Sequence, residues 1–339
     1  MIVALQGARG AGVAAFALAA AIVLPFVPGV YTVFAANLVC FALFAVSFDL
    51  LLGFTGLLSF GHALFWGGGA YVATIALAHA HLATPLAILV GTLYAAVASV
   101  LVGLLSIRRA GIYFAMITLA LAQLQFFIVF QLRDLTGGEN GLHLETRGTL
   151  FGLPLDGDRL FYYVVLLCAA AAVAFALRVI ASPFGMVLAA MRENEQRARS
   201  VGYDVQRFKL VAFVMSGTMA GLAGALYALN NRLVGLDVVD WHTSGAVVMM
   251  TILGGIGTIY GAIVGAALFQ SLEYFVSKTP IGDKTNVVMG TIFAIVILTA
   301  RRGIVGELLA LAGARRPAPV EEEPAPAETV GAEVPLPGA

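Results

Sequence analysis

Apolar segments of about 20 residues recur along most of this chain, and a water-soluble fold has no core large enough to bury them all. Roughly 20 apolar residues in a helix cross about 30 Å of bilayer hydrocarbon. Hydrophobic residues make up 60% of the sequence and charged residues only 11%, against about 25% charged residues in a typical soluble domain. The sequence therefore predicts an all-α integral membrane protein.

The residues that interrupt the apolar runs predict about ten transmembrane helices. Seven spans lie in the first 229 residues, at Ala11–Val27, Tyr31–Leu52, Leu57–Ala78, Pro85–Ile107, Ile112–Leu132, Leu160–Leu177 and Phe208–Leu229. Residues 245–300 fit either one long span with a re-entrant piece or three short crossings. The three crossings would be Ala246–Gly257, Ile259–Val276 and Val287–Ala300.

The basic residues of the loops predict the orientation, because Lys and Arg are retained on the cytoplasmic side. They fall at Arg9, at Arg108 and Arg109, in the polar segment 178–209 with its six basic residues, and at 301–302 and 315–316. Ten spans place all of these groups on one side, which selects the three-crossing alternative for 245–300. We expect a multi-pass protein of the bacterial inner membrane with both termini in the cytoplasm.

Composition also divides the chain. Residues 1–303 form the predicted transmembrane domain, residues 304–316 a cytoplasmic basic stretch, and residues 317–339 a disordered tail. The tail holds six of the 12 prolines and five of the 19 acidic residues, a composition that cannot bury a core. Cys40 and Cys168 each lie in an apolar run, so neither a disulfide framework nor a zinc site is expected. A cleaved signal peptide at the N-terminus is the alternative to a first span.

Two glycine-rich segments lie at membrane depth, at 53–71 and 254–266. One explanation is close helix packing, which small residues spaced four apart permit. The other is a broken helix whose free backbone groups line a solute path, with the two segments in two pseudo-symmetric halves. On the second explanation, the predicted path residues are Gly56, Ser59, Gly61, His62, Tyr71, Gly254, Gly255 and Gly257. For His62 alone, a structural hydrogen-bonded residue is favoured over a proton relay.

The polar segment carries the signals of a folded helix at 182–202. Ser182 and Pro183 form a helix start, and Gly202 stands where a helix end favours glycine. Apolar residues at helical spacing from Phe184 to Met191 would face the membrane domain. The residues alone leave two functions open: a solvated interfacial helix that fixes topology, or a docking helix for a cytoplasmic partner.

This segment resembles the cytoplasmic coupling loop of ABC importer permeases, in the form found in the branched-chain amino-acid permease family (LivM-type subunits). The resemblance covers roughly residues 30–303, and further motifs match the family in the same order. The matching segments are 51–63 with 69–71, 111–119, 136–142, 182–185, 192–198, 202–203, 209–213, 220–227, 254–258 and 301–303.

The resemblance implies an importer of several chains that moves branched-chain or related amino acids inward by alternating access. The implied partners are a second, H-type permease, two ABC ATPases and a periplasmic solute-binding protein, within membrane lipid and without nucleic acid. The residues that match the coupling motif, and so would contact an ATPase, are Arg192, Glu193, Asn194, Arg197 and Gly202. The chain contains no Gly-x-x-x-x-Gly-Lys-Ser/Thr phosphate loop, so ATP hydrolysis is expected on the partner chains. This chain is then a transporter subunit without catalytic residues, metal or cofactor.

Three alternatives stay open. The bulky Leu64, Phe65 and Trp66 depart from the smaller residues that the family commonly has there, so urea or short-chain amides are alternative solutes. An ion-coupled secondary carrier is a second alternative, although mid-span ionisable residues are scarce. A membrane-embedded enzyme would have to use His62 or the loop residues Glu139, Asn140 and His143.

Overall fold

The computed structural model describes residue 19 and residues 21–26, 31–109, 111–150, 152–279, 284–299, 303–305 and 307. The long helices are α2 (Thr32–Thr55), α3 (His62–Ala78), α4 (Thr84–Ser106), α5 (Ile112–Gln131), α7 (Asp158–Ile180), α10 (Val205–Asn231), α11 (Trp241–Gly254), α12 (Ile259–Ser277) and α13 (Thr285–Thr299). Short helices are η2 (Leu24–Phe26), α6 (Arg133–Thr136), η3 (Gly138–Asn140), α8 (Pro183–Glu193), α9 (Glu195–Ser200) and η4 (Leu236–Val239). Two antiparallel strand pairs join β1 (Leu142–His143) to β4 (Leu233–Val234) and β2 (Thr149–Leu150) to β3 (Leu153–Pro154).

Six helices are long and apolar enough to cross a membrane: α2, α4, α5, α7, α10 and α12. The three crossings predicted for 245–300 correspond to α11, α12 and α13, of which only α12 reaches that length in the described part of the chain. A helical membrane protein is confirmed, whereas the count of about ten is not. Most of the predicted first span and nearly all of the stretch after 303 lie outside the described residues.

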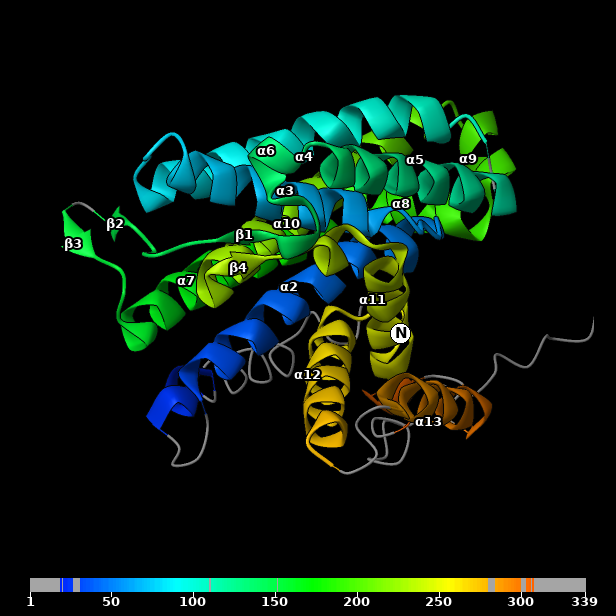
Figure 1. Cartoon of the computed structure of the whole chain (residues 1–339). Helices are drawn as coiled ribbons and strands as arrows, with labels where there is room; N and C mark the ends of the chain where they lie inside the picture. Colours follow the sequence, from blue (N-terminus) through cyan, green and yellow to red (C-terminus); the bar gives the residue numbers. More distant parts are fainter. Residues whose placement is uncertain are drawn as a thin grey trace, which may run out of the picture.

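Helix α10 lies at the centre of the bundle and packs against α2, α3 and α4. Figure 1 shows α3, α4 and α5 on one side of α2, and α11, α12 and α13 on the other. Small residues bring the central helices together: a Cβ on Gly221 would lie 2.0 Å from Cβ of Ala95 in α4, and one on Gly224 would lie 1.9 Å from the carbonyl oxygen of Trp66 in α3. Where lipid or protein surrounds both helices, such contacts rest on close packing rather than on the hydrophobic effect.

The helices have two distinct ends. Helices α8 and α9 lie at one end of the bundle and the β2–β3 hairpin at the other (Figure 1), here called the α8 end and the hairpin end. Helices α2 and α12 run antiparallel between them. At the α8 end, the Asp49 carboxylate contacts the Gly257 backbone N–H at 2.7 Å. Toward the hairpin end, the rings of Phe34 and Tyr274 lie 4.5 Å apart.

The third span begins later than predicted. Its helix was expected from Leu57, but α3 starts at His62. Gly56 ends α2 in the left-handed conformation, with φ of 74°, and residues 57–61 return toward the bundle without helical structure. Thr118 of α5 stabilises this return, because its hydroxyl accepts a hydrogen bond from the Phe60 N–H at 3.2 Å.

The single helix expected over 182–202 is also corrected. Asn194 adopts an extended conformation, with φ of −155° and ψ of 100°, and divides the segment into α8 and α9. Its side chain then caps α9 by accepting a hydrogen bond from the Arg197 N–H at 2.9 Å. A cap of this kind stabilises a short helix by about 1 kcal/mol.

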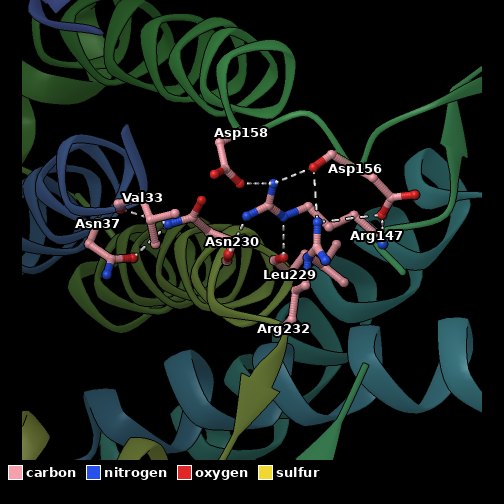
Figure 2. A network of polar contacts seen from close by, with 8 residues as sticks. All are labelled: Val33, Asn37, Arg147, Asp156, Asp158, Leu229, Asn230 and Arg232. Atoms are coloured by element: carbon pink, nitrogen blue, oxygen red, sulfur yellow. Dashed lines mark hydrogen bonds and ion pairs between the residues drawn. The ribbon is translucent and has the colours of Figure 1, made fainter. Parts of the chain in front are cut away.

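A buried arginine joins the helices at the hairpin end (Figure 2). The Arg147 side chain is only 2% exposed. Its guanidinium donates to the terminal carbonyls of α10, at Leu229 (3.2 Å) and Asn230 (2.8 Å), and to the Asp158 carboxylate at the start of α7 (2.7 Å). The last carbonyls of a helix have no intrahelical partner and carry partial negative charge. Arg147 therefore caps α10 and links it to α7.

Candidate functional site

Helix α8 is positioned by its own cap and by its apolar face. Ser182 accepts a hydrogen bond from the Gly185 N–H at 3.5 Å, and Pro183 occupies the first turn. Leu188 and Met191 are buried against the membrane helices. The Phe184 ring stacks on Phe208 of α10, with centroids 5.3 Å apart. The predicted apolar face is thus confirmed, and it holds α8 against the bundle.

An ion-pair network fixes α9 to α10. Glu195 lies 2.6 Å from both the Lys209 ammonium and the Arg199 guanidinium. Burial alone would raise the pKa of Glu195, but the hydrogen bonds and charges of Lys209 and Arg199 outweigh it and lower this pKa below its ordinary value. Lys209 is 8% exposed, and Glu195 is the carboxylate that compensates its buried ammonium. The α9 backbone is therefore held in place, with Ala198 buried and Gln196, Arg197 and Ser200 exposed to solvent.

The five predicted coupling residues lie together on this element. Arg192, Glu193, Asn194, Arg197 and Gly202 are all exposed and belong to α8, α9 and the turn that follows. Gly202 has φ of 100°, and a Cβ at this position would meet no atom within 4 Å. The glycine is therefore required by its backbone conformation rather than by a close neighbour.

Arg192 differs from the other four because its guanidinium turns toward the membrane helices. It donates a hydrogen bond to the backbone carbonyl of Gly53, in the last turn of α2. Gly53 in turn lies against Gly257, since a Cβ on Gly53 would be 2.7 Å from the Gly257 Cα. The buried Asp49 carboxylate accepts the Gly257 N–H. Arg192 thus connects α8 to α2 and, through Gly53, to the turn between α11 and α12.

The α11–α12 turn is built from close backbone contacts. A Cβ on Gly254 would lie 1.8 Å from the Gly261 carbonyl oxygen, and one on Gly265 would lie 2.0 Å from the Met250 carbonyl oxygen. A Cβ on Gly303 would lie 2.5 Å from the Gly255 Cα. These contacts support the packing explanation for the second glycine-rich segment.

We expect Gly265→Ala to disrupt this turn, because the added methyl group would overlap the Met250 carbonyl and the two helices would have to separate. Overpacking of this kind costs about 1–3 kcal/mol. Gly290→Ala in α13 is the matched control, since a Cβ there meets nothing within 4 Å. Thermal unfolding of the purified proteins should give a lower midpoint for Gly265→Ala and an unchanged one for Gly290→Ala. Equal midpoints would contradict this packing.

Four of the five path residues predicted in the first glycine-rich segment are packed inside protein, whereas Gly56 is exposed. His62 is fully buried, and its Nε2 lies 2.8 Å from the Ser216 hydroxyl. The rings of Phe48 and Phe65 lie 4.8 and 5.8 Å from the imidazole. Ser59 is also fully buried and accepts a hydrogen bond from the Gly61 N–H. The favoured structural interpretation of His62 fits these contacts.

A cavity of about 820 Å³ lies elsewhere, and none of the eight predicted path residues lines it. Side chains from α2, α5, α10, η4, α11, α12 and α13 surround it. Its apolar walls include Phe41, Phe126, Met249, Met250 and Phe269. Three carboxylates, of Asp237, Asp240 and Glu273, also line it. A volume in the range of small-molecule sites, with apolar walls and few polar groups, is typical of a ligand cavity.

The cavity lies toward the hairpin end. Asn37, one of its lining residues, bonds to Asn230 and Asn231 at the end of α10. Gly53 follows Asn37 by 16 positions along α2, which corresponds to about 24 Å of helix. The cavity and the α8–α9 element are therefore separate sites on the same helices.

Two groups of residues were not predicted from the sequence. Arg147 stands in a polar loop, and its only sequence signal is the pair of aspartates that follow at 156 and 158. The cavity residues have a clearer signal in Glu273, a carboxylate in the otherwise apolar α12. Among the residues that the structure describes, no cluster of three or more His, Cys, Asp or Glu side chains is arranged to hold a metal ion.

Comparison with known proteins gives a match over most of the chain. The family described as "Branched-chain amino acid transport system / permease component" matches residues 30–298. The high-affinity branched-chain amino acid transport system permease protein LivM of Escherichia coli K12 is 28% identical over 275 residues, which are 74% of this chain and 65% of that protein. LivM of Salmonella typhimurium is 28% identical over 67% of this chain and 59% of its own length.

A shorter match is to a permease protein that is named for a different solute. The autoinducer 2 import system permease protein LsrC of Yersinia enterocolitica is 34% identical over 30% of this chain and 29% of its own. The chain spans less than two thirds of the length of the two LivM proteins. No solved structure matches this chain.

Proposed function

This chain belongs to the permease-component family of branched-chain amino-acid transport systems, and from that membership we propose that it is the membrane subunit of an ATP-driven importer. It would move branched-chain or related amino acids inward, with a second permease, two ATPases and a periplasmic binding protein as partners. The α8 end would face the cytoplasm, in agreement with the basic residues of 178–209.

The observation that supports this proposal most is the placement of the α8–α9 element at the surface of the bundle. A short folded element with an apolar face against the bundle and a charged face in solvent is suited to docking a partner chain. Glu193, Asn194, Arg197 and Gly202 present the solvent side. A cap, an aromatic stack and a partly buried ion pair hold that surface in one position. A surface preorganised in this way binds without paying for its own ordering.

Arg192 supplies the link from the docking surface to the membrane helices. A displacement of α8 by an ATPase would move the Gly53 carbonyl, and with it the Gly53–Gly257 contact. Helices α2, α11 and α12 run from this contact to the cavity walls. In alternating access, these helices would then approach one another at one end of the bundle and separate at the other end. Rigid packed helices with two arrangements can transmit such a change over about 24 Å.

Urea and short-chain amides are the alternative solutes, because the sequence identity to LivM does not establish which solute this chain transports. Leu64, Phe65 and Trp66, the bulky residues that raised this alternative, are buried and do not line the cavity. The Trp66 ring lies 5.1 Å from Phe41 and 5.1 Å from Tyr227 in the cavity wall, so its size acts on the cavity only through these neighbours.

Crosslinking tests the docking role. A photoreactive amino acid at Gln196, which is exposed on α9, should crosslink to the ATPase encoded with this chain. The same label at the exposed Glu145, at the hairpin end, should not. A crosslink from position 145 alone, or from neither position in assembled complexes, would contradict the proposed docking surface.

A further inference from the structure

A second cavity, of about 470 Å³, lies between α4, α7 and α10. Helix α10 packs against both α4 and α7, whereas α4 and α7 do not pack closely against each other in the described part of the chain. The central helix is therefore uncovered here. Val214, Met215, Thr218 and Leu222 line the cavity and are partly exposed, although most of α10 beyond Ala212 is buried. We call this cavity the α7 groove.

The wall of the α7 groove is suited to hydrocarbon. Helix α7 contributes Ala171, Ala172 and Phe175, and no charged side chain lines the groove among the described residues. Thr92 and Thr218 carry its only hydroxyls in the same part of the chain, and each donates to the carbonyl four positions earlier on its own helix, at 2.8 and 2.7 Å. A polar solute would lose its hydrogen bonds to water here without regaining them. The wall therefore favours an apolar chain.

The two helix faces that form the groove both continue into an arginine at the α8 end. Residues three, four and seven positions apart share one face of a helix. Arg178, in the last turn of α7, follows Phe175 by three positions and Ala171 by seven. Arg207, in the first turn of α10, precedes Val214 by seven positions. Two positive charges thus lie at one end of an apolar groove.

Both arginines keep donors for a ligand. Arg178 is exposed and forms no ion pair with a described residue. Arg207 is 85% exposed and pairs through its Nε with Asp204 at 2.8 Å, which leaves its two terminal nitrogens for another acceptor. A guanidinium binds phosphate oxygens through parallel N–H donors. Basic pockets between transmembrane helices bind the headgroups of anionic lipids.

The length of the groove matches one leaflet of a bilayer. Cys168, the lining residue of α7 farthest from the α8 end, precedes Arg178 by ten positions. Ten residues of helix span about 15 Å. Half of the hydrocarbon thickness of a bilayer is also about 15 Å. An acyl chain that starts at a headgroup beside Arg178 would therefore reach the far end of the groove.

We propose that the α7 groove binds one anionic phospholipid, with an acyl chain against α7 and α10 and the phosphate at Arg178 and Arg207. A helix from another chain would also cover the alanines, but it would have to supply carboxylates to the two arginines. The lipid brings both the hydrocarbon and the negative charge. This inference goes beyond the proposed import function and does not depend on it.

Lipid retention tests the role of the arginines. The full chain would be purified in mild detergent from membranes of phosphatidylethanolamine, phosphatidylglycerol and cardiolipin, and its bound lipid counted by native mass spectrometry. We expect the wild type to retain phosphatidylglycerol or cardiolipin in preference to phosphatidylethanolamine. One arginine near an anionic headgroup changes binding about fivefold, so Arg178→Gln with Arg207→Gln should lower this retention by about tenfold or more. Arg108→Gln with Arg109→Gln removes the same charge from exposed sites at the α8 end and should retain lipid like the wild type.

A second pair of variants tests the groove itself. Ala172→Phe would place a ring in the groove while leaving both arginines intact, and it should lose the retained lipid. Ala174→Phe is the matched control, because Ala174 is an exposed residue of the same helix that does not line the groove. It should keep the lipid.

Equal retention of anionic lipid by the two arginine variants would overturn the inference, and so would retention by Ala172→Phe equal to that of Ala174→Phe. A photoreactive amino acid at Phe175, activated in the membrane, identifies the occupant. We expect an adduct with a phospholipid. A crosslink to another protein chain in place of that adduct would show that a partner helix covers the groove, which would also overturn the inference.

Discussion

Replacing Arg192 by methionine should abolish uptake while leaving the ATPases bound. Methionine keeps much of the side-chain volume but cannot donate to the Gly53 carbonyl, the contact that links α8 to α2. Partner binding should persist because Glu193, Asn194 and Arg197 remain exposed on the same element. We expect uptake to fall by about 100-fold or more, with ATP hydrolysis retained and no longer coupled to transport.

Two variants separate this role from partner contact. Arg192→Glu together with Arg197→Glu should abolish uptake and also weaken ATPase binding, since the second change reverses charge on the solvent face. Arg109→Met is the matched control, an exposed arginine at the same end of the bundle, and should transport normally. Membrane insertion should be unchanged in all three. Normal uptake by Arg192→Met would show that the Gly53 contact transmits nothing.

Replacing Arg147 by methionine should destabilise the protein more than any other single change considered. The guanidinium donates to three backbone carbonyls and one carboxylate from a side chain that is 2% exposed. Removing it leaves the end of α10 without its cap, and breaking a buried charged network costs about 3–5 kcal/mol. The apparent unfolding temperature in lipid nanodiscs, followed by intrinsic fluorescence, should drop by many degrees.

The Asp158 pairing should contribute little of this loss. The Asp158 side chain is 52% exposed, and ion pairs open to solvent are worth about 0–1 kcal/mol. The unfolding temperature of Asp158→Asn should therefore be close to that of the wild type. The unfolding temperature of Arg147→Lys should fall between those of the wild type and Arg147→Met, because an ammonium cannot reach all four acceptors at once. A midpoint for Arg147→Met equal to that of Asp158→Asn would contradict the capping role.

The sequence predicted the helices whose ends are marked by charge or proline. The spans expected at Pro85–Ile107 and Ile112–Leu132 correspond to α4 (Thr84–Ser106) and α5 (Ile112–Gln131). The later start of α3 was not predictable, because residues 57–61 are as apolar as a helix. The left-handed conformation of Gly56 and the contact of Phe60 with Thr118, 58 residues away, hold them outside it.

The two candidate sites also differed in how far the sequence predicted them. The coupling residues were found because a polar segment stands out in an apolar chain, and the structure places all five together. The path predicted at the glycines of 254–257 stays a prediction. The structure shows close backbone contacts at these glycines, and close approach and a broken helix leave the same sequence pattern. The cavity draws its residues from seven elements that are far apart in the sequence, and no local pattern brings such residues together.

Reconstituted transport tests the central claim most directly. Proteoliposomes would hold this chain with its partner permease and ATPases, and labelled leucine and the binding protein would be added outside. With ATP in the compartment that faces the ATPases, we predict accumulation of leucine that requires both ATP hydrolysis and the binding protein. Accumulation by this chain alone in a proton or sodium gradient, without any ATPase, would contradict the account.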